Sequence, residues 1–295
     1  MFLSKLFKMS LKATATKDST SREQTLVHLF NGIAADTSCF ASGDAVRAIV
    51  PKPTSVALLV GGLGKHHDFV VNGLRGELKH SVSARTKREE LEWRPWKDGV
   101  QFIQGQTKSK KALVFAPDYG LPLWTAWFEG HVRPFVVARV PTASAITLDG
   151  YVACASAMSC PAKAEAASKE LMRVLREDKV IQTALQTEWL RFEEAYLPTH
   201  PLIHGLFEDH IRDVLEEKDV WVCINKGGAH WIEGFVVRGV SYGGVKPKPH
   251  GGVVFQYSVA LQKKSGGEIR HVPVEYKLYW KNGGQAVQNL NFLVV

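Results

Sequence analysis

Val220-Trp-Val-Cys-Ile224 and Trp231-Ile-Glu-Gly-Phe-Val-Val237 open the part of the chain that decides the fold. Two longer runs of strand character follow, at residues 253–261 and 269–280. Glycine pairs punctuate these runs, at Lys226-Gly-Gly, Tyr242-Gly-Gly, His250-Gly-Gly, Ser265-Gly-Gly and Asn282-Gly-Gly. Short strands at regular spacing, separated by residues that tolerate positive φ, indicate an all-β meander. We therefore expect residues 219–295 to close into a small all-β barrel.

The third and fourth runs alternate between apolar and polar residues. One side of the third run carries Val253, Phe255, Tyr257, Val259 and Leu261. One side of the fourth carries Val274, Tyr276, Leu278 and Trp280, opposite Glu275 and Lys277. A period of two means that one face of the sheet is buried and the other is wetted.

The order Val-Trp-Val, Trp-Ile-Glu-Gly-Phe-Val-Val, Tyr-Ser-Val-Ala-Leu and His-Val-Pro-Val-Glu-Tyr resembles an SH3-like barrel of the Tudor type. The resemblance covers about a quarter of the chain. It implies a module that recognises a peptide, a methylated basic tail or nucleic acid. It would place Trp231, Tyr242 and Phe255 at an aromatic surface that holds a cation, although the same rings could fill the core of a small barrel. The loop 243–252 is longer than the family pattern and predicts either a basic contact loop or a solvated one.

A helical hairpin is expected at residues 162–217, before the barrel. Pro161 suits the start of a helix, and Leu197-Pro198 ends it. Between them, apolar residues recur at steps of three and four, at Ile181, Leu185, Trp189, Phe192 and Tyr196. Thr199 can cap a second helix that begins at Pro201.

The segment upstream of the hairpin is expected to be mixed and mostly β. A helix is predicted at residues 22–35, and a buried strand at 56–60. Residues 100–103 should pair with 112–115 as a hairpin, and further strand-like pieces lie at 122–128, 135–140 and 145–153. The predicted fold class is therefore α+β, with a mixed domain at 22–218 followed by the SH3-like barrel at 219–295.

The N-terminal segment, residues 1–21, is basic and amphipathic. Phe2, Leu6 and Phe7 lie on one side of a helical wheel, and Lys5 and Lys8 lie on the other. Such a segment suits a mitochondrial presequence, an anionic membrane contact through residues 1–12, or a tail that docks on its own domain. No apolar run of about 20 residues is present, so we predict no transmembrane helix.

The charge balance points to acidic partners. The chain has a formal net charge of +8, which favours nucleic acid or an acidic protein surface. Cations interleave with aromatic residues between positions 85 and 111, the combination that phosphate contact and base stacking require. The candidate nucleic-acid contacts are Arg85, Lys87, Arg88, Lys97, Lys108, Lys110, Lys111, Lys246 and Lys248.

A rival hypothesis is a papain-like cysteine peptidase. Cys39 precedes an aromatic residue, and His230 follows much later at the start of a strand, in the chain order of that family. The imidazole would hold the thiol as a thiolate, and Asn225 or Asp219 would orient it. The glycine-rich context of a papain nucleophile is absent around Cys39.

No metal site or cofactor is expected. Cys154 and Cys160 lack the spacing of zinc ligands, and the four cysteines are read as free thiols in a reducing compartment. The leading hypothesis is an intracellular, cytoplasmic or mitochondrial, recognition protein without enzymatic activity, with nucleic acid favoured over a peptide tail. The alternatives are the peptidase and an organellar or assembly-associated structural protein.

Overall fold

The protein has an α+β fold, seen in a computed structural model. The structure describes residues 21–50, 56–60, 67–82, 91–96, 101–103, 107–108, 113–114, 125–141, 145–148, 178–249, 251–280 and 290–294. Two compact units are formed. The first lies within Met1–Asp98, Asp209–Val240 and Val259–Val272, and the second within Gly99–Glu208, Ser241–Ser258 and Pro273–Val295.

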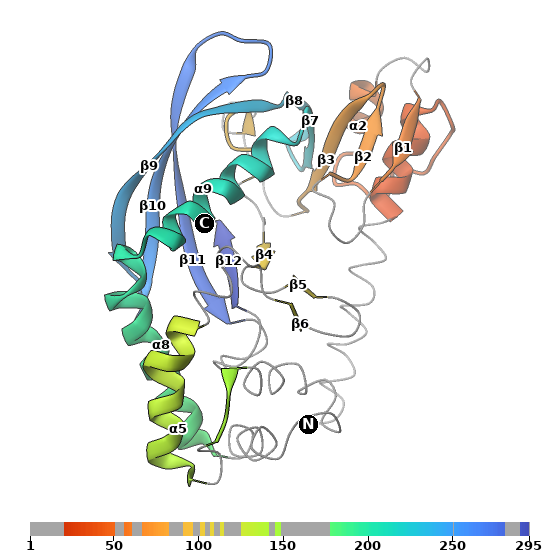
Figure 1. Cartoon of the computed structure of the whole chain (residues 1–295). Coiled ribbons are helices and arrows are strands. Elements are labelled where there is room, and N and C mark those ends of the chain that lie inside the picture. Colours follow the sequence, from red (N-terminus) through yellow and green to blue (C-terminus); the bar gives the residue numbers. More distant parts are fainter. Residues whose placement is uncertain are drawn as a thin grey trace. The chain divides into compact units, whose positions relative to one another are not determined.

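The first sheet has five strands in the order β1-β2-β3-β7-β8 (Figure 1). Its strands are β1 (Ala57–Leu59), β2 (Phe69–Val71), β3 (Leu74–His80), β7 (Val220–Asn225) and β8 (Gly228–Glu233). The pairs β1–β2, β2–β3 and β7–β8 are antiparallel, whereas β3 and β7 are parallel. All six residues of β7 are buried, as expected for a central strand with both edges and both faces covered.

One face of this sheet covers the core of the first unit. The helix of residues 21–30 and helix α2 (Gly43–Ile49) supply buried residues to this core. Leu26 and Phe30 are fully buried there, together with Phe69 and Val222. The Phe30 and Phe69 ring centroids lie 5.4 Å apart. Burial of these large side chains is the main term that stabilises the unit.

The second sheet also has five strands, in the order β4-β12-β11-β10-β9. Its strands are β4 (Gln101–Ile103), β9 (Phe235–Pro247), β10 (Val253–Lys263), β11 (Ile269–Trp280) and β12 (Leu290–Val294). The alternation predicted for the third and fourth runs is confirmed where the structure describes side chains. Phe255, Tyr257 and Val259 are buried, as are Val274 and Tyr276.

Two helices joined by a short proline-containing turn are present from residue 178 onward, as the sequence predicts. The segment consists of α8 (Lys179–Ala195), the short 3₁₀ turn η4 (Leu197–Thr199) and α9 (Pro201–Glu216). Asp178 caps α8 by accepting hydrogen bonds from the Val180 and Ile181 amides. From α9, Phe207 stacks on Tyr276 at a centroid distance of 4.5 Å and also contacts Phe255.

The closed SH3-like barrel expected at residues 219–295 is not confirmed. The described strands of this segment form open sheets, because β7 and β8 belong to the first sheet and β9 to β12 to the second. The division falls at Gly234, between β8 and β9. A Cβ atom at Gly234 would lie 2.2 Å from the Lys218 carbonyl oxygen, so only glycine fits where the chain leaves the first sheet.

Two other predicted strands are wrong. Residues 125–139 are helical, and include η1 (Phe128–Val132, a π-helical turn) and α5 (Arg133–Arg139). Trp127, Phe128 and Val132 form a helical apolar face that packs on α8, where the Trp127 and Trp189 centroids lie 5.2 Å apart. These three residues are spaced by one and four positions, which fits a helix. A short apolar run occurs in helices and in buried strands alike, so it does not distinguish between them.

One predicted strand pairing and one predicted turn are also corrected. Strand β4 pairs with β12 and not with residues 112–115, and β6 (Leu113–Val114) instead pairs with β5 (Thr107–Lys108). Tyr242-Gly-Gly lies inside β9 and not in a turn. Tyr242 contacts the buried Tyr257, whereas Lys246 reaches Glu275, which also binds the neighbouring Gln256. Residues four positions apart in a regular strand share a face, but Tyr242 and Lys246 contact opposite faces of the neighbouring strands. This change of face, together with Gly244 at φ 110°, indicates a β-bulge in β9.

Candidate functional site

A polar pocket of about 190 Å³ lies at the carboxyl ends of β3 and β7 in the first unit. Ligands commonly bind at the carboxyl ends of parallel strands, because the backbone and the following loops diverge there. The lining residues are Arg22, Glu23, Leu78, Lys79, His80, Ser81, Leu91, Pro95, Cys223, Ile224 and Asn225. We call this the β3–β7 pocket.

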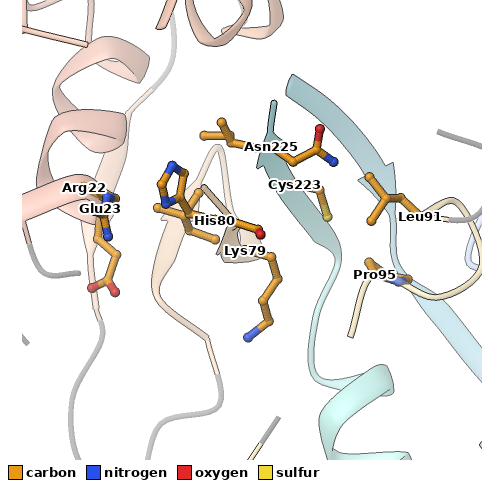
Figure 2. Close-up of a pocket in the computed structure, with 11 residues that line it drawn as sticks. Arg22, Glu23, Lys79, His80, Leu91, Pro95, Cys223 and Asn225 are labelled. Atoms are coloured by element: carbon orange, nitrogen blue, oxygen red, sulfur yellow. The ribbon is translucent and has the colours of Figure 1, made fainter. Parts of the chain in front are cut away.

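Four segments of the chain form its walls. Figure 2 shows Arg22 and Glu23 on one side and Leu91 and Pro95 on the other, with Lys79, His80 and Cys223 between them. Lys79 and Cys223 are partners in the β3–β7 register. The ladder continues one step past the strands, where the Ser81 amide donates to the Ile224 carbonyl at 3.0 Å. The pocket therefore exists only because β3 and β7 pair.

Charged contacts hold the amino-terminal ends of the same two strands together. Asp219 accepts hydrogen bonds from the Arg75 amide at 2.8 Å and from Arg75 Nε at 3.2 Å. Lys264 Nζ lies 2.5 Å from the other oxygen of Asp219. Burial alone would raise the pKa of Asp219, but the hydrogen bonds from Arg75 and Lys264 lower it to about 2. These contacts hold β3 and β7 in register and so position the pocket at their other ends.

His80 is a neutral donor at the pocket. Its Nε2 lies 3.0 Å from the Ala41 amide, which can only donate, so Nε2 accepts and the ring proton is on Nδ1. Burial lowers the pKa of His80, and the charge of Arg22 lowers it further. The ring is therefore uncharged at neutral pH, and Nδ1 keeps its proton.

Arg22 directs its guanidinium group to the pocket from the helix of residues 21–30. Its Nε donates to the Cys39 carbonyl at 3.0 Å, which fixes the orientation of the side chain. Within the part of the chain that the structure describes, the two terminal nitrogens of Arg22 make no ion pair. A guanidinium held at one edge presents its remaining donors to a ligand.

Lys79 belongs to a charge network behind the pocket. It forms an ion pair with Glu77, and its ammonium lies 5.9 Å from the Trp221 ring centroid. Glu77 also lies 3.7 Å from Lys218 Nζ, which is buried and donates to the Val214 carbonyl. Burial lowers the pKa of Lys218, and Glu77 opposes that change. Lys79 and Lys218 therefore share the carboxylate of Glu77.

Asn225 ends β7 with a fixed amide orientation. Its Oδ1 accepts from the Gly227 amide at 2.6 Å, so the opposite end of the side chain is the NH₂ donor. Its carbonyl accepts from Ser42 Oγ at 2.7 Å. The carboxylate of Glu23 also lines the pocket.

Most of the cations predicted to contact nucleic acid lie outside the described residues. Arg85, Lys87, Arg88, Lys97, Lys110 and Lys111 lie outside the described residues, as do residues 1–20. Lys108 lies in β5. The two lysines of the loop are engaged by carboxylates. Lys246 Nζ lies 2.6 Å from Glu275, and Lys248 Nζ lies 2.6 Å from the buried Glu193.

The three aromatic residues predicted to form one surface lie in different environments. Trp231 packs on the core of the first unit, edge-on to Phe30 at 5.9 Å. Phe255 is fully buried in the second unit against Phe207. Tyr242 is 41% exposed, and its ring lies 4.1 Å from that of His204. Two of the three therefore serve as packing residues, and Tyr242 is the exposed one.

Cys39 and His230 belong to different surroundings in the first unit. Cys39 packs beside the core, with Sγ 4.0 Å from Thr25 Oγ1 and 3.9 Å from the Asp36 carbonyl. Trp231 packs on that same core, and adjacent residues of a strand point to opposite faces. His230 is therefore on the other face of the sheet, where its register partner is Cys223.

Arg22, Lys79 and His80 were not among the candidates from sequence, and Asn225 was considered only as a residue that orients His230 in the peptidase hypothesis. No local motif marks them, since they come from three separate segments. A long-range parallel pairing brings them together, and single-sequence periodicity does not report such pairings.

The described residues contain neither a cluster of metal ligands nor a helix that could span a membrane. No group of three or more His, Cys, Asp or Glu side chains is arranged to hold a metal ion among them. None of the helices in the described ranges is long and apolar enough to cross a membrane. Comparison of the chain with family models, with curated proteins and with solved structures found no match.

Proposed function

We propose that the protein is a recognition protein that binds nucleic acid, and that the β3–β7 pocket is one of its phosphate contacts. The observation that carries the proposal is the placement of Arg22 at a polar pocket. A guanidinium at a polar pocket suits an anionic group, because it can donate charge-assisted hydrogen bonds to it.

The whole-chain charge supports the same ligand. A net charge of +8 attracts a polyanion at long range and accelerates encounter at low salt. Lys79 is paired with Glu77, so Arg22 is the cation of the pocket that can attract an anion. Arginine is also suited to phosphate, since its planar fork can donate two parallel hydrogen bonds.

The loop lysines contribute less to this proposal than Arg22. Lys246 and Lys248 form close ion pairs with Glu275 and Glu193, and a phosphate would have to displace those carboxylates. Arg22 needs no such exchange within the described structure. We therefore expect Arg22 to contribute more to binding than either loop lysine.

The test is the salt dependence of binding to a single-stranded oligonucleotide, measured by fluorescence anisotropy with the full chain. The logarithm of the binding constant should fall linearly with the logarithm of the salt concentration. Arg22→Gln should weaken binding and reduce the slope by about 1, as expected for the loss of one phosphate contact.

Arg47→Gln is the matched control. Arg47 lies in α2 of the same unit, outside the pocket, and donates to the Ala35 carbonyl. The substitution removes the same charge, so it reports the effect of net charge alone. Equal losses for the two variants would contradict a phosphate contact in the pocket, and salt-independent binding would contradict the function itself.

A further inference from the structure

A two-residue turn, Asn72-Gly73, joins β2 to β3. Val71 and Leu74 are partners in the ladder on either side of it. Asn72 has φ 49° and Gly73 has φ 81°, the positive values that a type I′ hairpin turn requires. Both residues are exposed. An asparagine followed by glycine is also the pair in which the backbone most readily attacks the side-chain amide, because glycine has no side chain to obstruct the approach.

The contacts around Asn72 favour that attack. Its Oδ1 accepts a hydrogen bond from the Val56 amide at 3.1 Å. A donor at a carbonyl oxygen stabilises the negative charge that develops when the carbon is attacked. The attacking atom is the Gly73 nitrogen, whose N–H makes no hydrogen bond within the described residues. A Cβ atom on Gly73 would meet nothing within 4 Å, so the turn has room to bring this nitrogen toward Cγ.

A second Asn-Gly pair, Asn31-Gly32, has both reacting nitrogens engaged. Asn31 Oδ1 accepts from the Ala57 amide at 2.7 Å, and Asn31 Nδ2 donates to the Ala57 carbonyl at 2.9 Å. The Gly32 N–H donates to the Leu29 carbonyl at 3.0 Å. The same dipeptide therefore stands in a protected arrangement in the same unit. The third pair in the sequence, Asn282-Gly283, lies outside the described residues.

We propose that Asn72 is a site of spontaneous deamidation in the folded protein. The Gly73 nitrogen loses its proton to solvent base and forms a bond to Asn72 Cγ. The Cγ–Nδ2 bond breaks and Nδ2 leaves as ammonia, which gives a succinimide. Water then opens the ring. Cleavage at the side-chain carbonyl gives aspartate, and cleavage at the main-chain carbonyl gives isoaspartate. The reaction consumes only water, so it is independent of the proposed nucleic-acid binding.

Isoaspartate should change the turn more than aspartate. Aspartate retains an acceptor for the Val56 amide. Isoaspartate carries the main chain through its Cβ, which adds one atom to a turn that the β2–β3 register fits with two residues. That register places Gly76 opposite Phe69, where even an added Cβ would lie 2.1 Å from the ring. Accumulation of isoaspartate should therefore weaken the pairing of β2 with β3.

The test incubates the folded full chain in a mildly alkaline buffer and follows both described pairs in one digest by mass spectrometry. Enzymatic methylation of isoaspartyl groups identifies the branched product. The peptide with Asn72-Gly73 should be converted several-fold faster than the peptide with Asn31-Gly32. In denaturant the two rates should become similar, because glycine follows both asparagines and the folded contacts are lost. Equal rates in the folded chain, or the same ratio in denaturant, would overturn the assignment.

Asn72→Gly is the control variant, because a Gly-Gly turn accepts the same positive φ values and has no side-chain amide. As isoaspartate accumulates, the urea midpoint of the chain with Asn72 should fall, whereas that of Asn72→Gly should stay constant. Freshly purified Asn72→Asp should match the fresh chain with Asn72, because the charge alone leaves the turn intact. An unchanged midpoint in isoaspartate-rich protein would overturn the effect on the turn, and an equal fall in Asn72→Gly would assign the loss to another residue.

Discussion

Lys248 Nζ lies 2.6 Å from Glu193 Oε1, and only 1% of the Glu193 side chain is exposed. The same carboxylate accepts hydrogen bonds from Trp189 Nε1 at 3.0 Å and from the Val253 amide at 3.0 Å. The neighbouring Glu194 accepts from the Gly252 amide. Two consecutive glutamates of α8 therefore hold the turn between β9 and β10, and the basic loop predicted from sequence is a structural element.

Removal of Lys248 should destabilise the protein strongly. Lys248→Met leaves Glu193 buried without its counter-charge, and breaking a buried pair costs about 3–5 kcal/mol. Burial already raises the pKa of Glu193, against the opposing effect of Lys248, so protonation will recover part of that loss. Urea unfolding measures the change in the free energy of unfolding. The double variant Glu193→Gln with Lys248→Met should be more stable than Lys248→Met alone; the reverse order would show that the pair carries little energy.

Asp219 should make the first unit sensitive to acid. Its pKa is lowered from 3.8 to about 2, so the folded state binds its proton less tightly than the unfolded state. The stabilisation is present above about pH 4 and is lost as the pH falls through 2. Asp219→Asn should cost about 1–3 kcal/mol at pH 7 and progressively less toward pH 2. Unfolding curves at both pH values check this, and a cost independent of pH would contradict it.

Asp68 should have the opposite effect. Burial raises its pKa to about 7, and the charge of Glu77 adds to the increase. The folded state therefore binds the proton more tightly, and the stabilisation is complete below about pH 4 and lost as the pH rises through 7. Asp68→Asn retains an acceptor for the Leu78 amide, which lies 2.8 Å from Asp68. It should raise the free energy of unfolding at pH 8 by about 1–2 kcal/mol and have little effect at pH 4. Equal effects at both pH values would count against a titrating Asp68.

Gly76 should not tolerate a side chain. A Cβ atom at this position would lie 2.1 Å from the ring of Phe69, which is fully buried. Gly76→Ala should therefore destabilise the protein by about 1–3 kcal/mol, as overpacking does. Gly130→Ala is the control, because Gly130 is helical and its Cβ would meet nothing within 4 Å. That variant should be neutral or stabilising by about 0.5–1 kcal/mol. Thermal unfolding ranks the two, and similar losses would exclude the steric explanation.

The strands of the C-terminal segment could be predicted from sequence because their signals are local. The period of two in residues 253–261 depends only on neighbouring residues, and β10 buries the predicted side. The helices α8 and α9 likewise follow from steps of three and four and from Pro201. Partner choice is not local. Nothing in Val220–Asn225 indicates that β3, which lies outside the C-terminal meander, is its neighbour in the sheet.

The pocket could not be predicted for the same reason. Arg22, Lys79 and Asn225 are unremarkable in their own segments, and each acquires significance only from its neighbours in space. The predicted candidates followed clusters of charge along the chain. Such clusters do not report contacts like that of Lys248, whose ammonium lies 2.6 Å from the buried carboxylate of Glu193.

The parallel pairing of β3 with β7 also bears on how the protein can be synthesised and divided. Arg75 and Asp219, which meet where the two strands begin, are 144 residues apart in sequence. Contacts of such long range form slowly, because a large loop must close before they are made. While the ribosome is still adding residues before Val220, the N-terminal strands lack their central neighbour. Truncations that end anywhere between β3 and β7 should therefore accumulate as aggregates, and expression of shortened forms should retain the chain through β8.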